Sequence, residues 1–245
     1  MNLLLLDAAE LDAGDTVTLA DGRARHLREV LRVVPGQTVR AGVVDGPLGS
    51  ASVVEVHADR VMLDAAALRC AAVPARPRVD LVLAMPRPKV FARLLSALAA
   101  VGVGRVMVTN AAKVERYYFD CHQLEPEAIR LRLIAGLVQA RDTRMPLLTL
   151  HRSFRKLVEH ELPQAERRLL ADVDDRLPRV AAACGDLGAE ARVLVAVGPE
   201  GGWVDFERGL LVQAGFSPVS FGARVLAADV ASVLALGLVH DALRR

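Results

Sequence analysis

Two glycine-bearing loops hold the residues best suited to chemistry on a bound ligand. The first, Gly198-Pro199-Glu200-Gly201-Gly202, directly follows the predicted strand 192–197. Its glycines let the backbone come close to a ligand, and open α/β sheets bind ligands outside the carboxyl ends of their strands. The loop is neither a P-loop, since no Lys-Ser/Thr pair follows, nor the GxGxxG fingerprint. A simple tight turn is the alternative interpretation.

The second loop covers residues 221–229 and also joins an apolar strand to a helix. Two such loops at the same end of a sheet could hold the two ends of one cofactor. Val225 and Leu226 could form an apolar slot for a nucleobase, and Asp229 could cap the helix that follows.

The elements that must position these loops alternate between strand and helix in the second part of the chain. A helix with Phe91, Leu94, Leu95 and Leu98 on one face is expected to stop at Gly102, because glycine adopts the left-handed cap with least strain. Such alternation predicts a mostly parallel α/β sheet. The expected strands are 80–85, 105–108, 168–171, 192–197 and 218–221, and the other expected helices are 125–140, 205–214 and 229–243.

The first part of the chain is predicted to be a small barrel of short strands. Segments 16–19, 38–44, 52–56 and 61–63 are separated by Asp-Gly, Pro-Gly and Leu-Gly turns. One helix is expected from Ala24 to Val33, with Leu27, Val30 and Leu31 on its apolar face. We predict a first domain of residues 1–72, a proline-stiffened linker of 73–78 and a second domain of 79–245.

Composition excludes several classes of protein. No stretch approaches the roughly 18 apolar residues of a membrane span, and the opening residues 1–7 indicate a first strand and not a signal peptide. The three scattered cysteines suggest reduced thiols, with no disulfide framework and no metal site. The net charge of +2 argues only weakly for a polyanionic partner. Arginine supplies nearly all the positive charge, which suits phosphate contact but follows equally well from a biased genome composition.

The order and spacing of four segments make the sequence similar to a known family. The chain resembles the ribosomal RNA small subunit methyltransferase E family, the 16S rRNA uridine-N3 methyltransferases of the SPOUT class. The matching segments are His26-Leu27-Arg28-Glu29-Val30-Leu31-Arg32 with Pro35-Gly36, Leu94 to Val106, Val195 to Gly202, and Ala214 to Leu226.

The resemblance implies a fold, a cofactor and a partner. The first domain would be a PUA-like RNA-binding β-barrel, and the second a SPOUT α/β domain with a trefoil knot, an exception to the usual unknotted topology. The protein would be a cytoplasmic homodimer that binds S-adenosylmethionine and acts on 16S ribosomal RNA or the small ribosomal subunit. The expected cofactor-binding residues are Met85, Val197, Gly198, Pro199, Glu200, Gly201, Gly202, Phe221, Gly222, Val225, Leu226 and Ala227.

The sequence departs from the family pattern after Leu226. Where the family usually carries Arg-x-Glu-Thr-Ala, this chain has Ala227-Ala228-Asp229-Val230-Ala231. The segment 138–146 also lacks the usual Glu-Gln-Ser/Cys-Gly-Arg, which is typical of a divergent branch. The cofactor loops are intact, whereas the target base and the efficiency of catalysis stay open.

Catalysis and RNA binding are assigned to a few charged residues. Arg224 is expected to stabilise a developing oxyanion on the uracil ring, with Asp229 orienting it or accepting a proton; a surface arginine and a helix cap are the alternatives. The expected RNA contacts, for which a solvated surface is the alternative, are Arg23, Arg25, His26, Arg28, Arg32, Arg141 and Arg144. Tyr117, Tyr118 and Trp203 are too few for a broad stacking platform, and Trp203 is expected in the core.

Three interpretations remain open. The first is an active rRNA methyltransferase. The second is an RNA-binding or ribosome-assembly protein that keeps the fold and has lost catalysis, which the change at Ala227 keeps plausible. The third is another α/β enzyme that binds a different nucleotide.

Overall fold

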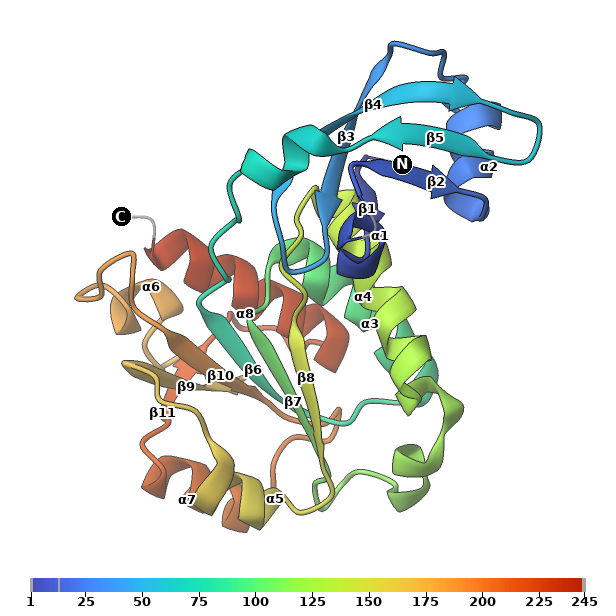
Figure 1. The fold of residues 1–245 in the computed structure, drawn as a ribbon. Coiled ribbons are helices and arrows are strands. Elements are labelled where there is room, and N and C mark those ends of the chain that lie inside the picture. The colour runs from blue at the N-terminus through green and yellow to red at the C-terminus, as the bar shows by residue number, and fades with distance from the viewer. Residues whose placement is uncertain (1, 13, 244–245) are drawn as a thin grey trace. The chain divides into compact units, whose positions relative to one another are not determined.

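The chain forms two compact units in a computed structural model that describes residues 2–12 and 14–243 (Figure 1). The first unit contains the chain up to Arg76 together with Ile134–Met145. The second contains Pro77–Leu133 and Pro146 onward. Residue 1, in the expected first strand, lies outside the described residues.

A five-stranded sheet organises the first unit, with strand order β1-β3-β4-β5-β2. β1 pairs with β3 in parallel, and the other pairs are antiparallel. Alternate residues of β2 are buried, with Val17 and Leu19 in the core, as expected where one face of a strand is covered. The strands are β1 (Leu4–Leu6), β2 (Thr16–Leu19), β3 (Thr38–Val43), β4 (Leu48–Val56) and β5 (Val61–Asp64).

The helix of the first unit differs from the predicted one. Helix α2 spans Gly22–Glu29, and the carboxylate of Asp21 caps it by accepting from the Arg23 amide at 2.8 Å. The chain leaves helical geometry before Arg32, whose φ is +50°. Val30 and Leu31 are therefore 64% and 42% exposed, and their predicted place on the apolar face was wrong.

The segment Ile134–Met145 is tied to the first unit through Thr143. Thr143 is fully buried, its hydroxyl donates to the Gly46 carbonyl at 2.7 Å, and its own carbonyl accepts from the Asp45 amide at 2.8 Å. A Cβ at Gly42 would lie 2.5 Å from the Thr143 methyl group, so any other residue there would displace the buried Thr143 side chain. Short-range sequence patterns do not reveal this connection.

Six parallel strands form the sheet of the second unit, in the order β11-β9-β10-β6-β7-β8. The predicted parallel α/β sheet is confirmed, although the edge strand β8 was not foreseen. Every residue of β6 and β10 is buried, which accounts for the apolar runs 81–84 and 193–197. The strands are β6 (Val79–Ala84), β7 (Arg105–Thr109), β8 (Leu147–His151), β9 (Arg167–Asp172), β10 (Val193–Val197) and β11 (Ser217–Ser220).

Helices cover the faces of this sheet. The predicted stop at Gly102 is confirmed, because Gly102 caps α3 with a left-handed φ of 92°. α8 packs against α3 and against strands β6 and β10. The four long helices are α3 (Pro88–Val101), α4 (Pro126–Ala140), α7 (Asp205–Gln213) and α8 (Ala228–Leu243). Shorter helical turns are α1 (Ala8–Asp12), α5 (Phe154–Lys156), α6 (Val180–Ala183), the 3-10 turns Ala66–Cys70, Arg116–Asp120 and His122–Leu124, and the π-turn Leu157–Glu161.

None of the helices in the described part of the chain is long and apolar enough to cross a membrane. Within the same residues no group of three or more His, Cys, Asp or Glu side chains could hold a metal ion.

One buried ion pair supports the edge of the sheet where its strands begin. The Asp80 carboxylate is fully buried and accepts from Arg192 at 2.9 Å. Burial raises the pKa of Asp80 above its usual value, whereas the hydrogen bond from Arg192 lowers it. Without that arginine, the carboxylate would be buried without its charged partner.

We expect Arg192→Ala to lower the free energy of unfolding by about 3 kcal/mol, the typical cost of breaking a buried pair. The pKa of Asp80 would rise further in this variant. Because folding then favours the protonated carboxyl, stability relative to the wild type should decline as pH rises from acid to neutral. Urea denaturation at several pH values measures this loss. Arg167→Ala is the control, since its partner Asp186 is 71% exposed; an equal loss in both variants would contradict the prediction.

Candidate functional site

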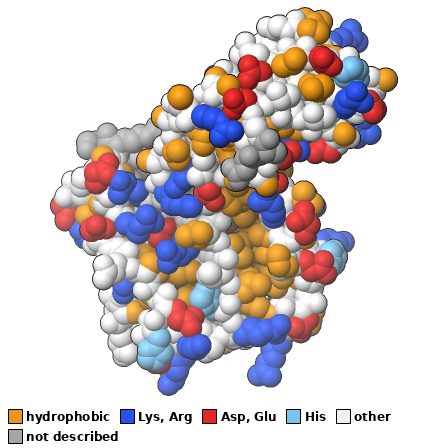
Figure 2. Space-filling model, viewed as in Figure 1, with side chains coloured by type: hydrophobic (Ala, Val, Ile, Leu, Met, Phe, Trp, Pro, Cys, Tyr) orange, Lys and Arg blue, Asp and Glu red, His pale blue; other side chains and the backbone are white. Residues whose placement is uncertain are grey.

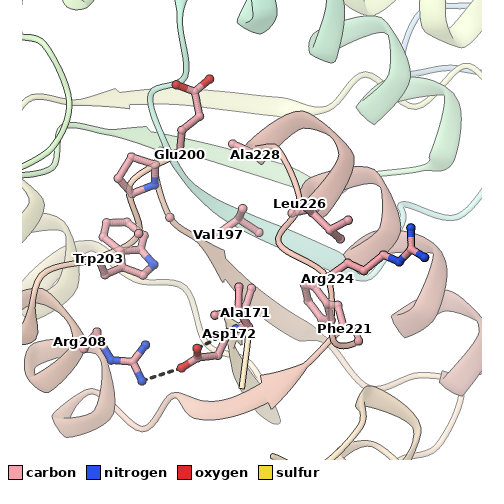
Figure 3. A pocket seen from close by; sticks show the side chains of 16 residues that line it. Ala171, Asp172, Val197, Glu200, Trp203, Arg208, Phe221, Arg224, Leu226 and Ala228 are labelled. Atoms are coloured by element: carbon pink, nitrogen blue, oxygen red, sulfur yellow. Dashed lines mark hydrogen bonds and ion pairs between the residues drawn. The ribbon is translucent and has the colours of Figure 1, made fainter. Parts of the chain in front are cut away.

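A cavity of about 220 Å³ opens where strands β9, β10 and β11 end. All six strands are parallel, so their carboxyl ends meet at one edge, where ligands of open α/β sheets bind. Figure 3 shows Val197 at its back, Trp203 and Arg208 on one side, and Phe221 and Leu226 on the other. The lining residues are Ala171, Asp172, Val173, Val197, Gly198, Pro199, Glu200, Gly202, Trp203, Arg208, Phe221, Gly222, Arg224, Leu226, Ala228 and Ala231.

The first glycine loop forms one wall against the indole of Trp203. A Cβ at Gly198 would lie 3.0 Å from the indole Nε1, so a side chain there would push the ring aside. Gly202 has a left-handed φ of +71°, and its amide donates to the Pro199 carbonyl at 2.7 Å. The buried Trp203 Nε1 has no hydrogen-bond partner among the described residues. This wall therefore combines a bare backbone with a buried N–H that no described residue satisfies.

The second glycine loop closes the opposite wall. Gly222 has a φ of +131°, and its amide donates to the Ser220 hydroxyl at 3.2 Å. Leu226 lines the cavity, whereas Val225 is 79% exposed and does not. The predicted apolar slot therefore rests on Leu226, Val197 and Ala228.

Arg224 is one of the residues that line the cavity. Its guanidinium extends away from the centre of the cavity (Figure 3). The side chain is exposed and makes no hydrogen bond or ion pair with any described residue. An arginine in this setting can change rotamer at little cost.

Asp229 lies one residue inside α8 and does not line the cavity. Its carboxylate is 3.6 Å from the Arg93 guanidinium and accepts from the Val230 amide at 3.0 Å. The helix begins at Ala228, so the expected cap at Asp229 was wrong. No interaction between Asp229 and Arg224 is present in the structure.

The cavity wall contains an ion pair between Asp172 and Arg208 that was not predicted from the sequence. Asp172 ends β9, and its carboxylate lies 2.6 Å from the Arg208 guanidinium of α7. The Asp172 side chain is only 11% exposed. Its position directly after an apolar strand was the available signal, because the end of β9 must reach the same sheet edge as β10.

The structure brings together eight of the twelve expected cofactor residues. Val197, Gly198, Pro199, Glu200, Gly202, Phe221, Gly222 and Leu226 line the cavity, whereas Met85, Gly201, Val225 and Ala227 do not. Met85 is buried after β6 and donates to the Thr109 carbonyl at 2.9 Å. The Gly201 carbonyl accepts from Lys113 Nζ at 2.6 Å. Trp203 is buried as expected, but it also lines the cavity.

The expected RNA contacts of the first unit differ in availability. Arg23 lies 2.7 Å from both Glu10 and Asp21. The pKa of Arg23 is raised, mainly by its hydrogen bond to Glu10, and the same bond lowers the pKa of the Glu10 carboxyl. This guanidinium is therefore held by protein partners.

Arg28 donates to the Ala58 carbonyl, and Arg144 donates to the Asp45 carbonyl at 2.9 Å. The side chains of Arg25 and Arg32 are exposed and have no partner among the described residues, but Arg32 lies beyond the end of α2. One helix therefore carries Arg25 and Arg28 but not Arg32. His26 is half-buried, and Arg141 is exposed with a φ of +62°.

A parallel α/β sheet with a glycine-walled cavity at its strand ends defines a class of proteins that bind small ligands there. Residues 74–240 match the RNA methyltransferase domain family, and the chain belongs to this family. The family expectation and the assignment to the methyltransferases are therefore confirmed.

Relatives of this chain carry matching names. It is 28% identical over 249 residues to the ribosomal RNA small subunit methyltransferase E of Treponema pallidum (strain Nichols), covering 98% of this chain and 90% of the relative. It is 25% identical to the protein of the same name from Synechocystis sp., covering 92% of this chain and 73% of the relative.

Solved structures share the fold across nearly the whole chain. A probable rRNA-methyltransferase from Porphyromonas gingivalis matches with a TM-score of 0.77 and 21% identity, covering 98% of each chain. The ribosomal RNA small subunit methyltransferase E from Neisseria gonorrhoeae, solved bound to S-adenosyl methionine, matches with a TM-score of 0.74 and 20% identity. That match covers 97% of this chain and 95% of the other.

Gly198→Val should displace the Trp203 indole, because even a Cβ would lie within 3.1 Å of two indole atoms. Trp203 is the sole tryptophan of the sequence, so its fluorescence reports the change directly. We expect a red-shifted emission as the ring becomes more exposed. Gly209→Ala, where the added Cβ meets open space on α7, is the control; an emission spectrum identical in both variants would refute the contact.

Proposed function

We propose that this protein transfers a methyl group from S-adenosylmethionine to N3 of a uridine in 16S ribosomal RNA, acting in the cytoplasm. The observation that carries the proposal is the glycine-walled cavity at the sheet edge, inside a chain that belongs to the RNA methyltransferase family. The names of the Treponema pallidum and Neisseria gonorrhoeae relatives support the choice of ribosomal RNA.

The cavity suits S-adenosylmethionine better than a nucleotide phosphate. Leu226, Val197 and Ala228 give an apolar surface for adenine, and the two glycine loops bring bare backbone to the cavity walls. Arg208, a cation in the wall, is already paired with Asp172. When bound, the cofactor supplies an electrophilic methyl group.

The chain's own residues would hold and activate the uridine. N3 carries a proton that must leave before the nitrogen can attack a methyl carbon, and the negative charge then spreads to the ring oxygens. Arg224, a lining residue without a partner, is proposed to turn inward and stabilise that charge. Asp229 is proposed to accept the proton from N3. In this structure its carboxylate lies 3.6 Å from the Arg93 guanidinium.

The remaining family properties belong to the same proposal. The first unit would be a PUA-like barrel that binds RNA through Arg25, Arg32 and Arg141, with His26 beside them. Arg23, Arg28 and Arg144 would position these groups, because protein partners already occupy their guanidinium groups. The second unit would contain a trefoil knot, and the protein would be a homodimer. The domain limits would follow residues 1–72, 73–78 and 79–245.

A second candidate function is RNA binding without catalysis, as in a ribosome-assembly protein. Ala227, Asp229 and Val230 favour it, because the family usually carries Arg, Glu and Thr at these places. Ala227 is exposed outside the cavity, and Asp229 is paired with Arg93.

Calorimetry and RNA mapping test the proposal together. We expect S-adenosylmethionine to bind with a micromolar dissociation constant, with no heat from NAD or ATP. Labelled methyl groups should appear in small-subunit RNA, and nucleoside mass mapping should find 3-methyluridine only when the protein is present. Cofactor binding without methyl transfer would support the assembly protein, and absence of cofactor binding would overturn both the cofactor and the enzyme.

Arg224→Ala should lower the rate of methyl transfer by about 100-fold, the usual effect of losing one oxyanion donor. Its affinity for S-adenosylmethionine should stay close to that of the wild type, because the cofactor contacts are made by other residues. Arg132→Ala, an exposed arginine on α4, is the matched control. Unchanged turnover in Arg224→Ala would remove this residue from the mechanism.

A further inference from the structure

A second cavity, of about 350 Å³, lies at the same sheet edge as the first. Asn110 directly follows β7 and Arg152 directly follows β8, and both line this cavity. The remaining wall includes Arg116 from the turn after β7, Phe154 and Arg155 from α5, and Phe206 from α7. The proposed methyl transfer uses none of these residues.

Positive charge dominates this cavity. Arg116 is exposed and has no hydrogen bond or ion pair with any described residue. Arg152 pairs with Asp120 at 2.8 Å, but both side chains are about two-thirds exposed, and Arg155 is 4.0 Å from Glu159. Exposed pairs of this kind are weak and exchange readily for another anion.

The acidic residue that lines the cavity, Glu207, forms no ion pair with these arginines. Glu207 is buried and accepts from the Ala112 amide at 2.7 Å and the Val204 amide at 3.0 Å. Its two carboxylate oxygens are therefore directed at backbone donors. Figure 2 shows Lys and Arg side chains at the lower edge of the second unit, where α5 and the end of β8 lie in Figure 1.

An exposed aromatic ring accompanies the arginines. Phe206 is 55% exposed, and the Arg155 guanidinium lies over its ring, 5.0 Å from the centroid. Stacked arginine and aromatic groups are the surfaces on which proteins hold unpaired bases, and arginine also binds phosphate in a bidentate manner. The combination fits a nucleotide better than it fits a simple anion.

One contact joins lining residues of the second cavity and the cofactor cavity, and a hydrogen bond links the loops beside them. The ring of Phe154, which lines the second cavity, packs on the ring of Trp203, which lines the first, with centroids 5.0 Å apart. Lys113, in the turn after β7, donates to the Gly201 carbonyl of the first glycine loop. RNA that placed a base at the first cavity would thus have neighbouring nucleotides at the second.

We infer that Arg116, Arg152, Arg155 and Phe206 form an arginine pocket that binds a single-stranded nucleotide flanking the methylated base. The arginines hold its phosphate, and its base stacks on the Phe206–Arg155 pair. This inference rests on the proposed function for the position of the target base. It assigns RNA binding to the catalytic unit as well as to the first unit.

Fluorescence anisotropy of the full chain with a labelled single-stranded oligouridine tests the arginine pocket. Arg116→Glu and Phe206→Ala should each weaken binding about tenfold, as expected from a lost phosphate contact or a lost stacked base. Arg116→Glu should also reduce the slope of log affinity against log salt by about 0.7. Arg132→Glu, the same charge change on α4, is the control and should match the wild type.

A second readout locates the RNA and separates the two proposals. A 4-thiouridine oligonucleotide should crosslink to peptides containing Phe206 or Arg116. In the methylation assay, Arg116→Glu should raise KM for RNA. Its kcat and its affinity for S-adenosylmethionine should equal those of the wild type. Equal binding by Arg116→Glu, Phe206→Ala and Arg132→Glu would overturn the arginine pocket even if the wild type methylates RNA. Crosslinking at Phe206 by a protein that methylates nothing would retain the pocket and reject the proposed reaction.

Discussion

The parallel hydrogen-bond ladder of β9, β10, β6 and β7 is the constraint on which the rest of this structure depends. Because these strands run in one direction, everything that follows them emerges at a single edge. The two glycine loops, Asp172 and the turn after β7 are far apart in the sequence, yet the ladder places them along that edge. The buried Asp80–Arg192 pair supports the opposite edge.

Glycine and tryptophan together set the shape of the ligand cavity. Gly198 leaves room for the Trp203 indole, and the indole in turn separates the cofactor cavity from Phe154. One side chain therefore faces a proposed cofactor on one side and borders a proposed RNA site on the other. This arrangement lets the two substrates sit next to each other without sharing residues.

The sequence predicted the elements that carry a strong pattern. The buried strands β6 and β10, the Gly102 cap and the two glycine loops follow from apolar runs and glycine chemistry, and the structure confirms them. β8 was missed although Leu147-Leu148-Thr149-Leu150 is mostly apolar, and its side chains are largely exposed in the structure. Val30 and Leu31 were wrongly placed on the apolar face of the first helix, because apolar spacing does not reveal where a helix ends. The Asp172–Arg208 pair and the arginine pocket depend on contacts between distant segments, which a single sequence does not encode locally.

The allocation of Ile134–Met145 to the first unit has a consequence for how the protein is made. This segment follows several elements of the second unit in the chain, yet its Thr143 is buried among residues 42–46. During synthesis the first unit cannot complete its hydrogen bonds until more than half of the polypeptide has left the ribosome. The first unit is thus not a freely exchangeable module. A gene rearrangement that cut between residues 76 and 77 would leave it without Ile134–Met145 and would leave that segment without its packing partners.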